Sequence, residues 1–266
     1  MSSFEFLRVD RVDDTLRVMI DRPEQRNPLG TEVLAELRRA FTEGASDESL
    51  HAAIITGAGI RSFAAGGDLK EFDTLRTAED AERLWTSANE TLRAVREFPV
   101  PVIAVLNGVA LGGGAELAVA CDFRVAASHA GIGFVQGRMN ICTGFGGGVD
   151  LVALVGGHRA LSILIDAETM SAERARSIGL VDAVANEDES LEQCVERFLQ
   201  PIRAQAPQVL RAFKTIALGE RLALSRAERE QRERQAMIAT WIHPDHWQAS
   251  ERFLHRNRGN GPDSHR

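Results

Sequence analysis

The chain has 266 residues, 44% of them apolar and 26% charged, with a net charge of -7 and a pI of about 5.6. This composition is typical of a globular protein with one large domain or one domain with a helical appendage, and it lacks the basic excess that nucleic-acid binders usually show. No run of about 18 apolar residues is present, so we expect no membrane span. The three cysteines have neither a disulfide pattern nor CxxC spacing, and the first residues do not resemble a signal peptide, so we expect a cytoplasmic protein.

Strand and helix patterns alternate along the first half of the chain. The expected strands cover residues 16–21, 52–56 and 101–108, and the expected helices cover residues 32–41, 78–97, 112–120 and 147–155. Such alternation predicts an α/β core with parallel strand pairing. From residue 158 onward the patterns are helical with almost no strand signal. We therefore expect a core at residues 1–195 and a helical region at residues 196–266.

The most specific feature is a glycine-rich segment between a strand and a helix. The strand ends at Gly108, and Gly112 to Gly114 open the helix. The first turn of a helix leaves backbone N–H groups without partners, and glycine allows a ligand to approach them. Glu116 follows Gly113 by three residues and shares its face of the helix. This arrangement predicts an oxyanion hole with an acid/base group beside it, and the alternative is a glutamate that only stabilises the helix N-terminus.

A dinucleotide site and a metal site are weaker possibilities. After the strand at residues 52–56, the chain continues as Gly57-x-Gly59-x-x-Ser62, so the third glycine of the dinucleotide fingerprint is missing. Residues 63–67 are expected to form a loop, and no helix opens directly behind the glycines. The histidines of the chain are scattered without the spacing of metal ligands, so we expect no metal site.

Four segments together carry a family resemblance. They are DRPEQRNPL at residues 21–29, SFAAGGDLKEF at residues 62–72, PVIAVLNGVALGGGAELAVACD at residues 101–122, and MSAERARSIGLVDAV at residues 170–184. In this order the chain resembles the crotonase (enoyl-CoA hydratase/isomerase) superfamily over about residues 15–255. The resemblance implies a crotonase-like spiral of ββα units with a helical C-terminal trimerisation region. It also implies a homotrimer or dimer of trimers, and an acyl-CoA substrate that carries its own coenzyme A, with no separate cofactor.

Carried over by position, the resemblance assigns roles to individual residues. Gly67 and Gly113 would supply two N–H groups to the thioester oxygen, and Glu116 would be one of two acid/base carboxylates. The expected coenzyme A contacts are Arg22, Arg26, Ala64, Ala65, Gly66, Asp68, Lys70 and Gly112. The cations among them can equally be solvated surface charges, and Asp68 is expected mainly as the N-cap of a short helix at residues 69–72. Candidates for the acyl-chain pocket are Trp85, Phe134, Met139 and Phe145.

The position of the family's second carboxylate holds Gln136 in this chain. Residues 134–138, FVQGR, contain no acid, and a glutamine can orient a water molecule or a carbonyl but cannot accept a proton. Glu116 alone could still support hydration or isomerisation. Decarboxylation of a malonyl-CoA-type thioester needs no base, and residues 134–148 are also similar to crotonase-type alkylmalonyl-CoA decarboxylases. The remaining alternative is a catalytically silent relative that only binds acyl-CoA.

Overall fold

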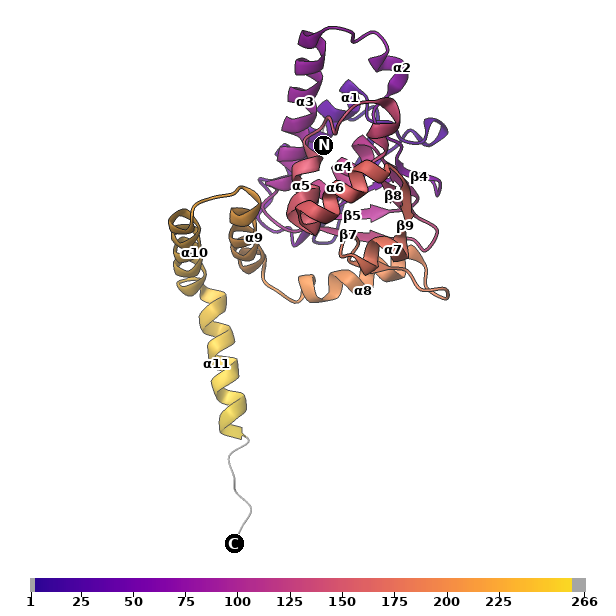
Figure 1. Ribbon diagram of the computed structural model, residues 1–266. Helices are drawn as coiled ribbons and strands as arrows, with labels where there is room; N and C mark the ends of the chain where they lie inside the picture. Colours follow the sequence, from indigo (N-terminus) through magenta and orange to yellow (C-terminus); the bar gives the residue numbers. More distant parts are fainter. Residues whose placement is uncertain (1–2, 260–266) are drawn as a thin grey trace. The chain divides into compact units, whose positions relative to one another are not determined.

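The computed structural model describes the backbone of residues 3–259 and the side chains up to residue 254. It separates into two compact units, one ending at Gln205 and one beginning at Ala206, and each is described by itself. The first unit carries both sheets (Figure 1). It also contains every residue predicted for the substrate site. The boundary that we expect near residue 195 lies inside helix α8 (Leu191–Arg203), which belongs entirely to the first unit.

The first unit is built on two sheets. Their strands are β1 (Leu7–Val12), β2 (Thr15–Ile20), β3 (Ala52–Gly57), β4 (Ser62–Ala64), β5 (Val102–Leu106), β6 (Val109–Leu111), β7 (Phe123–Ala126), β8 (Gly131–Gly133), β9 (Thr169–Ser171) and β10 (Ala183–Val184). The larger sheet has the order β1-β2-β3-β5-β7-β10, and the smaller sheet has the order β4-β6-β8-β9. Only β1–β2 and β8–β9 are antiparallel among these pairs.

Strands β3 to β8 alternate between the two sheets, and helices follow each pair. The helical elements of this unit, apart from α8, are η1 (Pro23–Gln25), α1 (Thr31–Gly44), α2 (Leu69–Phe72), α3 (Ala78–Arg96), α4 (Gly113–Ala120), η2 (Val135–Met139), α5 (Gly147–Val155), α6 (Gly157–Asp166) and α7 (Ala172–Ser177). Each ββα unit thus adds one strand to each sheet before a helix covers it. This repeat agrees with the expected α/β core and its parallel pairing.

The long helices bury the apolar faces that their sequences predict. Helix α1 buries Leu34, Leu37 and Phe41, which share one face at helical spacing, and each such side chain contributes about 1.5–3 kcal/mol. The Phe41 ring meets Phe98 edge to face with centroids 5.3 Å apart. Helix α3 begins with a capping box between Thr77 and Asp80, which satisfies donors at its N-terminus. Helices α1 and α3 pack against each other, and Thr91 Oγ1 of α3 donates to the carbonyl oxygen of Leu34 in α1 at 2.9 Å.

The second unit consists of α9 (Pro207–Arg221), α10 (Arg226–Trp241) and α11 (Pro244–Gly259). Helices α9 and α10 form an antiparallel hairpin, and α10 has no buried side chain within the described chain. Large apolar side chains of this unit are exposed, namely Phe213, Ile216, Met237, Ile238, Trp241 and Ile242. A helix pair this short cannot bury such surface by itself.

The smaller sheet was missed in large part by sequence reasoning. Residues 63–67 were expected to be loop, but Ser62–Ala64 is the buried strand β4. Strands β6, β8 and β9 also have three residues each, too few to show a period of two. Because β4 and not a helix follows β3, the glycines at positions 57 and 59 do not form a dinucleotide turn.

Candidate active site

The candidate residues lie at the carboxyl ends of three neighbouring parallel strands of the smaller sheet. Gly66 and Gly67 follow β4, Gly113 follows β6, and Gln136 follows β8. The loops after parallel strands meet at one edge of a sheet, where ligands of α/β proteins bind. The fold therefore brings together three segments that are far apart in the sequence.

Two glycine segments touch each other at this edge. A Cβ atom added to Gly66 would lie 3.7 Å from the amide nitrogen of Gly113 and 3.1 Å from the carbonyl oxygen of Leu111. Gly66 and Gly112 have φ angles of 101° and 52°, which favour glycine. Within residues 3–259, the amide N–H groups of Gly67 and Gly113 have no hydrogen-bond partner. Sheltered N–H groups are nearly always paired, so these two donors are suited to an acceptor from a ligand.

The start of α4 requires glycine because it packs directly on its neighbours. A Cβ atom on Gly114 would lie 2.1 Å from the carbonyl oxygen of Ala64, and one on Gly113 would lie 2.5 Å from the ring of Phe145. Ala64 is fully buried, and Ala65 is half-buried. The first turn of α4 is therefore fixed against β4 without any intervening side chain.

The carboxylate of Glu116 accepts four hydrogen bonds in a site where the residue is 1% exposed. Oε1 accepts from Gln136 Nε2 at 2.8 Å and from the amide of Gly144 at 3.1 Å. Oε2 accepts from the amides of Phe145 and Gly147, both at 2.9 Å. An ionised carboxylate has about four acceptor positions, so all of them are occupied. Glu116 thereby fastens the loop at residues 143–147, and the first turn of α5, to α4.

Burial raises the pKa of Glu116 above its ordinary value, while the hydrogen bonds from Phe145, Gly144, Gly147 and Gln136 act in the opposite direction. Desolvation penalises the charged form, and the four donors stabilise it. The net upward direction moves the carboxyl group toward the range in which acid/base residues exchange protons near neutral pH.

Gln136 has a paired donor and an unpaired acceptor. The residue is 8% exposed, its Nε2 donates to Glu116, and its Oε1 has no partner among the described residues. A Cβ atom on Gly112 would lie 4.0 Å from Gln136 Cδ, so the amide lies beside the segment that carries Gly113. An unpaired buried acceptor costs about 1–3 kcal/mol. Such a cost is typical of a group that serves function and not stability.

The loop before α5 is held on both sides. A Cβ atom on Gly147 would lie only 2.4 Å from the Cβ atom of Glu116, so α4 and α5 approach each other through glycine. On another face, Arg96 of α3 pairs with Asp150 of α5, with Nε–Oδ1 at 3.0 Å and Nη2–Oδ2 at 2.7 Å. This bidentate pair is largely buried, and it fixes α5 relative to α3.

Arg22 and Asp68 are bound to each other. Arg22 Nη1 donates to Asp68 Oδ2 at 3.1 Å, and the guanidinium lies 5.2 Å from the centroid of the Phe6 ring. Asp68 precedes α2 as the sequence predicts, and the helix has the expected bounds. Asp68 is therefore the N-cap residue, as predicted, but its carboxylate makes no capping hydrogen bond and pairs with Arg22 instead.

Arg26 and Lys70 are exposed, and neither forms an ion pair within the part of the chain with described side chains. The carbonyl oxygen of Arg26 accepts from the amide of Ala65 at 3.1 Å, which places Arg26 next to the backbone expected to line the coenzyme A path. Of the four aromatic and methionine candidates for the acyl pocket, Phe134 and Phe145 are buried, whereas Trp85 and Met139 are about half exposed.

Sequence reasoning missed the three loop amides that bind Glu116. The signal is present in Gly144-x-Gly146-Gly147, because successive N–H groups in a turn that enters a helix form an anion-binding concavity. Gly146 has a φ of 91°, as such a turn requires. In the sequence this pattern is identified only as a loop of the family, and Glu116 only as an acid/base group for the substrate. The anion that the loop amides bind is the carboxylate of Glu116 itself.

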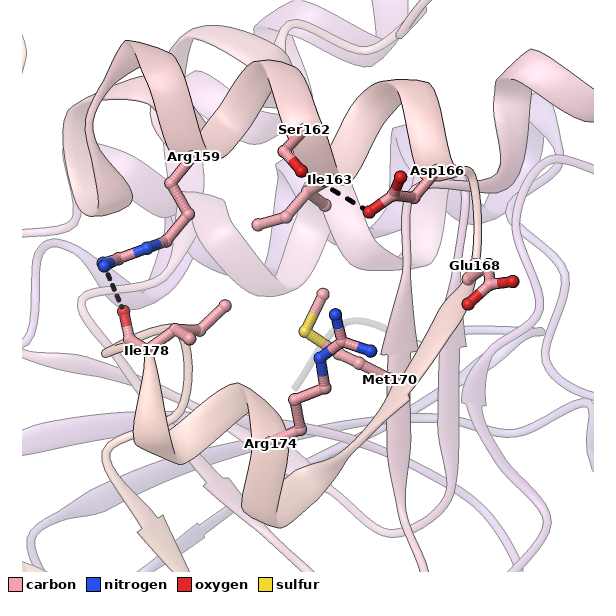
Figure 2. A pocket seen from close by; sticks show the side chains of 8 residues that line it. All are labelled: Arg159, Ser162, Ile163, Asp166, Glu168, Met170, Arg174 and Ile178. Carbon is pink, nitrogen blue, oxygen red and sulfur yellow. Dashed lines mark hydrogen bonds between the residues drawn. The ribbon is translucent and has the colours of Figure 1, made fainter.

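Two other hollows lie outside this site. A pocket of about 100 Å³ between α6, β9 and α7 has Met170 at its base and mixed charges at its rim (Figure 2). Figure 2 shows Arg159 bonded to the Ile178 carbonyl and Ser162 bonded to Asp166, so these polar groups are already partnered. A groove of about 600 Å³ crosses the face of the larger sheet beside α8. Neither hollow contains a residue with a predicted role.

Within residues 3–254, no cluster of three or more His, Cys, Asp or Glu side chains is placed to hold a metal ion. No helix in the part of the chain that the structure describes has both the length and the apolar character to cross a bilayer.

The sequence of this chain is similar to a family model and to several known proteins. A family model described as Enoyl-CoA hydratase/isomerase matches residues 13–258. The Crotonyl-CoA hydratase of Syntrophomonas wolfei subsp. wolfei is 34% identical over 215 residues, which is 81% of this chain and 82% of that protein. The Ethylmalonyl-CoA decarboxylase of Bos taurus is 32% identical over 237 residues, covering 88% of this chain and 76% of that protein.

A solved structure shows the same architecture. The enoyl-CoA hydratase from Bacillus anthracis superposes with a TM-score of 0.87 at 30% identity, covering 95% of this chain and 97% of that one. This likeness confirms the crotonase-like fold that the sequence predicts.

Proposed function

The chain belongs to the enoyl-CoA hydratase/isomerase family, and we propose that it binds an acyl-CoA thioester and stabilises its enolate with the amides of Gly67 and Gly113. The observation that carries this proposal is a pair of N–H groups that have no hydrogen-bond partner among the described residues and that follow the adjacent strands β4 and β6. Donors held in place before the reaction stabilise the charge that develops on the thioester oxygen. Losing one such donor costs about 2.7–4 kcal/mol of transition-state stabilisation.

Glu116 is the proposed proton-transfer group, and the reaction is hydration or isomerisation. In hydration, water adds to C3 of an enoyl thioester, the electron pair moves through C2 to the thioester oxygen, and C2 then takes a proton. In isomerisation, a proton leaves one carbon and returns to another. The raised pKa of Glu116 supports either role, because an acid/base group works best with a pKa near the working pH.

Decarboxylation is the second candidate, and the four occupied acceptor positions of Glu116 favour it. A malonyl-CoA-type thioester loses CO2 when the C–C electron pair moves to the thioester oxygen, so no base has to remove a proton. The two amides would hold the same enolate, and Gln136 need not be acidic. The relative named Ethylmalonyl-CoA decarboxylase has a similar degree of identity to the relative named Crotonyl-CoA hydratase.

Coenzyme A would enter along Ala64, Ala65 and Gly66, with Arg26 and Lys70 as the cations for its phosphates. Both side chains are exposed, and neither forms an ion pair with another described side chain, which supports this assignment. Arg22 is the weaker candidate because Asp68 already engages it. No separate cofactor is proposed, since the thioester itself carries coenzyme A.

Two experiments test the function. Acetoacetyl-CoA bound to an oxyanion hole gains enolate character, which its ultraviolet absorbance reports. We expect this absorbance to rise on binding, and an unchanged spectrum with no measurable binding would refute the proposal. Incubation with crotonyl-CoA, and separately with methylmalonyl-CoA or ethylmalonyl-CoA, then identifies the reaction. Release of CO2 from the malonyl thioesters without hydration of crotonyl-CoA would reject the hydratase and establish the decarboxylase.

A homotrimer or dimer of trimers is the proposed assembly. The support is the exposed apolar surface of the second unit, including Trp241 and Ile242, which the unit does not bury by itself. Light scattering coupled to size exclusion measures the mass in solution. A monomer at micromolar concentration would contradict this proposal.

A further inference from the structure

Of the four donors around Glu116, one can turn into an acceptor. The amides of Gly144, Phe145 and Gly147 can only donate, and the last two belong to the turn that enters α5. Gln136 carries a donor and an acceptor on one planar amide. Rotation of this amide by about 180° about its terminal torsion exchanges the two groups with almost no change of shape.

We propose that Gln136 is a positioning residue whose side-chain amide reverses with the protonation state of Glu116. While Glu116 is ionised, Gln136 Nε2 donates to its Oε1. After Glu116 has taken a proton on Oε1, that O–H donates to Gln136 Oε1, which then faces the carboxyl group. This inference rests on the proposed function, because it explains how one carboxylate serves as acid and base without a second.

The hydrogen bonds of Glu116 select the atom that takes the proton. Oε2 holds the amides of Phe145 and Gly147 at 2.9 Å, and protonating it would break a bond that fixes α5. Oε1 is held by Gln136 and by the longer 3.1 Å bond from Gly144. The proton therefore goes to Oε1, on the side that Gln136 covers.

The unpaired Oε1 of Gln136 keeps the free-energy difference between the two orientations of its amide small. In the observed state Nε2 is paired and Oε1 has no partner among the described residues. In the reversed state Oε1 is paired and Nε2 is not. Each state leaves one amide atom unpaired, so the two states are close in energy, which a reversible proton carrier requires.

The chemical step balances without a second carboxylate. A proton leaves C2 of the thioester for Glu116 Oε1, and the C–H electron pair moves to the thioester oxygen as the enolate. One N–H···O bond is exchanged for one O–H···O bond at Gln136. The charged groups on the packed elements do not compete: Asp150 of α5 pairs with Arg96 of α3, and Arg138 of η2 is exposed.

Exchange of deuterium into C2 of butyryl-CoA in heavy water tests the inference across a range of pH. Gln136→Met removes both polar groups, and we expect it to lower the exchange rate roughly 100-fold. Gln136→Glu can donate when protonated and accept when ionised, so it should keep the rate within about ten-fold of wild type, with its pH optimum raised because the two carboxyls share a proton. Cys142→Ser, an exposed position near the loop, is the matched control and should behave as wild type.

Each outcome has one meaning. A Gln136→Met variant that exchanges as fast as Gln136→Glu overturns the inference, because a residue that only holds Glu116 in place would tolerate Met better than a second acid. A wild type that neither binds butyryl-CoA nor exchanges overturns the proposed function, and the inference falls with it. Neutron diffraction above and below the titration midpoint distinguishes the amide nitrogen from the oxygen. An unchanged Gln136 orientation in both states would also overturn the proposal.

Discussion

The contact between α4 and α5 can be perturbed by one methyl group. In Gly147→Ala, the new Cβ atom would lie 2.4 Å from Cβ and 2.5 Å from Cα of Glu116. Carbon atoms pack at about 3.5–4.0 Å, so the start of α5 has to move by about 1 Å or more. The backbone of α4 lies on the other side, and it cannot turn away as a flexible side chain would.

The expected cost has two parts. Overpacking of a tight core costs about 1–3 kcal/mol. The shift also weakens the bonds from Phe145 and Gly147 to Glu116, and hydrogen bonds to charged groups contribute about 1.5–3 kcal/mol each. Partial relaxation reduces the sum, so we expect a loss of about 3 kcal/mol in the free energy of unfolding. For a unit of this size, such a loss lowers Tm by about 6–12 °C.

Differential scanning calorimetry measures this effect, and Gly144→Ala is the matched control. Gly144 lies in the same loop, its φ is not positive, and a Cβ atom there meets nothing within 4 Å. Its Tm should change by no more than about 2 °C. If Gly147→Ala melts within that same margin of the wild type, the close approach of α5 to Glu116 is not as described.

Three further substitutions test the pKa of Glu116, the Arg96–Asp150 ion pair and the two exposed cations. Burial raises the pKa of Glu116 in the folded state, so the protonated carboxyl group stabilises the fold. This stabilisation is complete below the ordinary pKa of 4.5 and is lost as pH rises through the pKa of the folded state. Glu116→Gln should therefore weaken the pH dependence of the free energy of unfolding in urea over this range. Arg96→Met leaves Asp150 with a buried charge and should cost about 3 kcal/mol in urea unfolding, part of which a double variant with Asp150→Asn recovers. Arg26→Ala and Lys70→Ala should each raise KM for acyl-CoA about five-fold with kcat unchanged, as steady-state kinetics at low salt would show; a fall in kcat would contradict a role in coenzyme A binding.

The parts of the fold that could be predicted are those with a long period. Helices α1, α3 and α5 have enough turns for a repeated apolar face, and their observed bounds lie within a few residues of the prediction. Strand β3 was found for a different reason, because it is a continuous apolar run that ends at a glycine. The three-residue strands of the smaller sheet have no period to detect, although Gly67, Gly113 and Gln136 all follow such strands.

The candidate site was predictable where backbone chemistry decides it. Glycines before a helix predicted unpaired donors at Gly113, and the structure has such a donor there. The partners of Glu116 could not be predicted in the same way, since the amides of Phe145 and Gly147 reach it across about 30 residues of chain. The pairing of Arg22 with Asp68 was missed because it joins two loops, and only the closed fold places them side by side.

Overall sequence similarity to known enzymes does not decide which reaction this chain catalyses, and we expect a few side chains to decide it. Its identity to a crotonyl-CoA hydratase is 34% and to an ethylmalonyl-CoA decarboxylase 32%, so these two identities do not distinguish the two reactions. In the proposed mechanism both reactions pass through the same enolate, whose donors would be the amides of Gly67 and Gly113. What would differ is the source and the fate of the proton, which the proposal assigns to Glu116 and to its contact with Gln136. Substitutions at position 136 should therefore change the rate or the outcome of the reaction while the fold stays intact. Substitutions at Gly113 or Gly147 should lower both the activity and the stability of the fold.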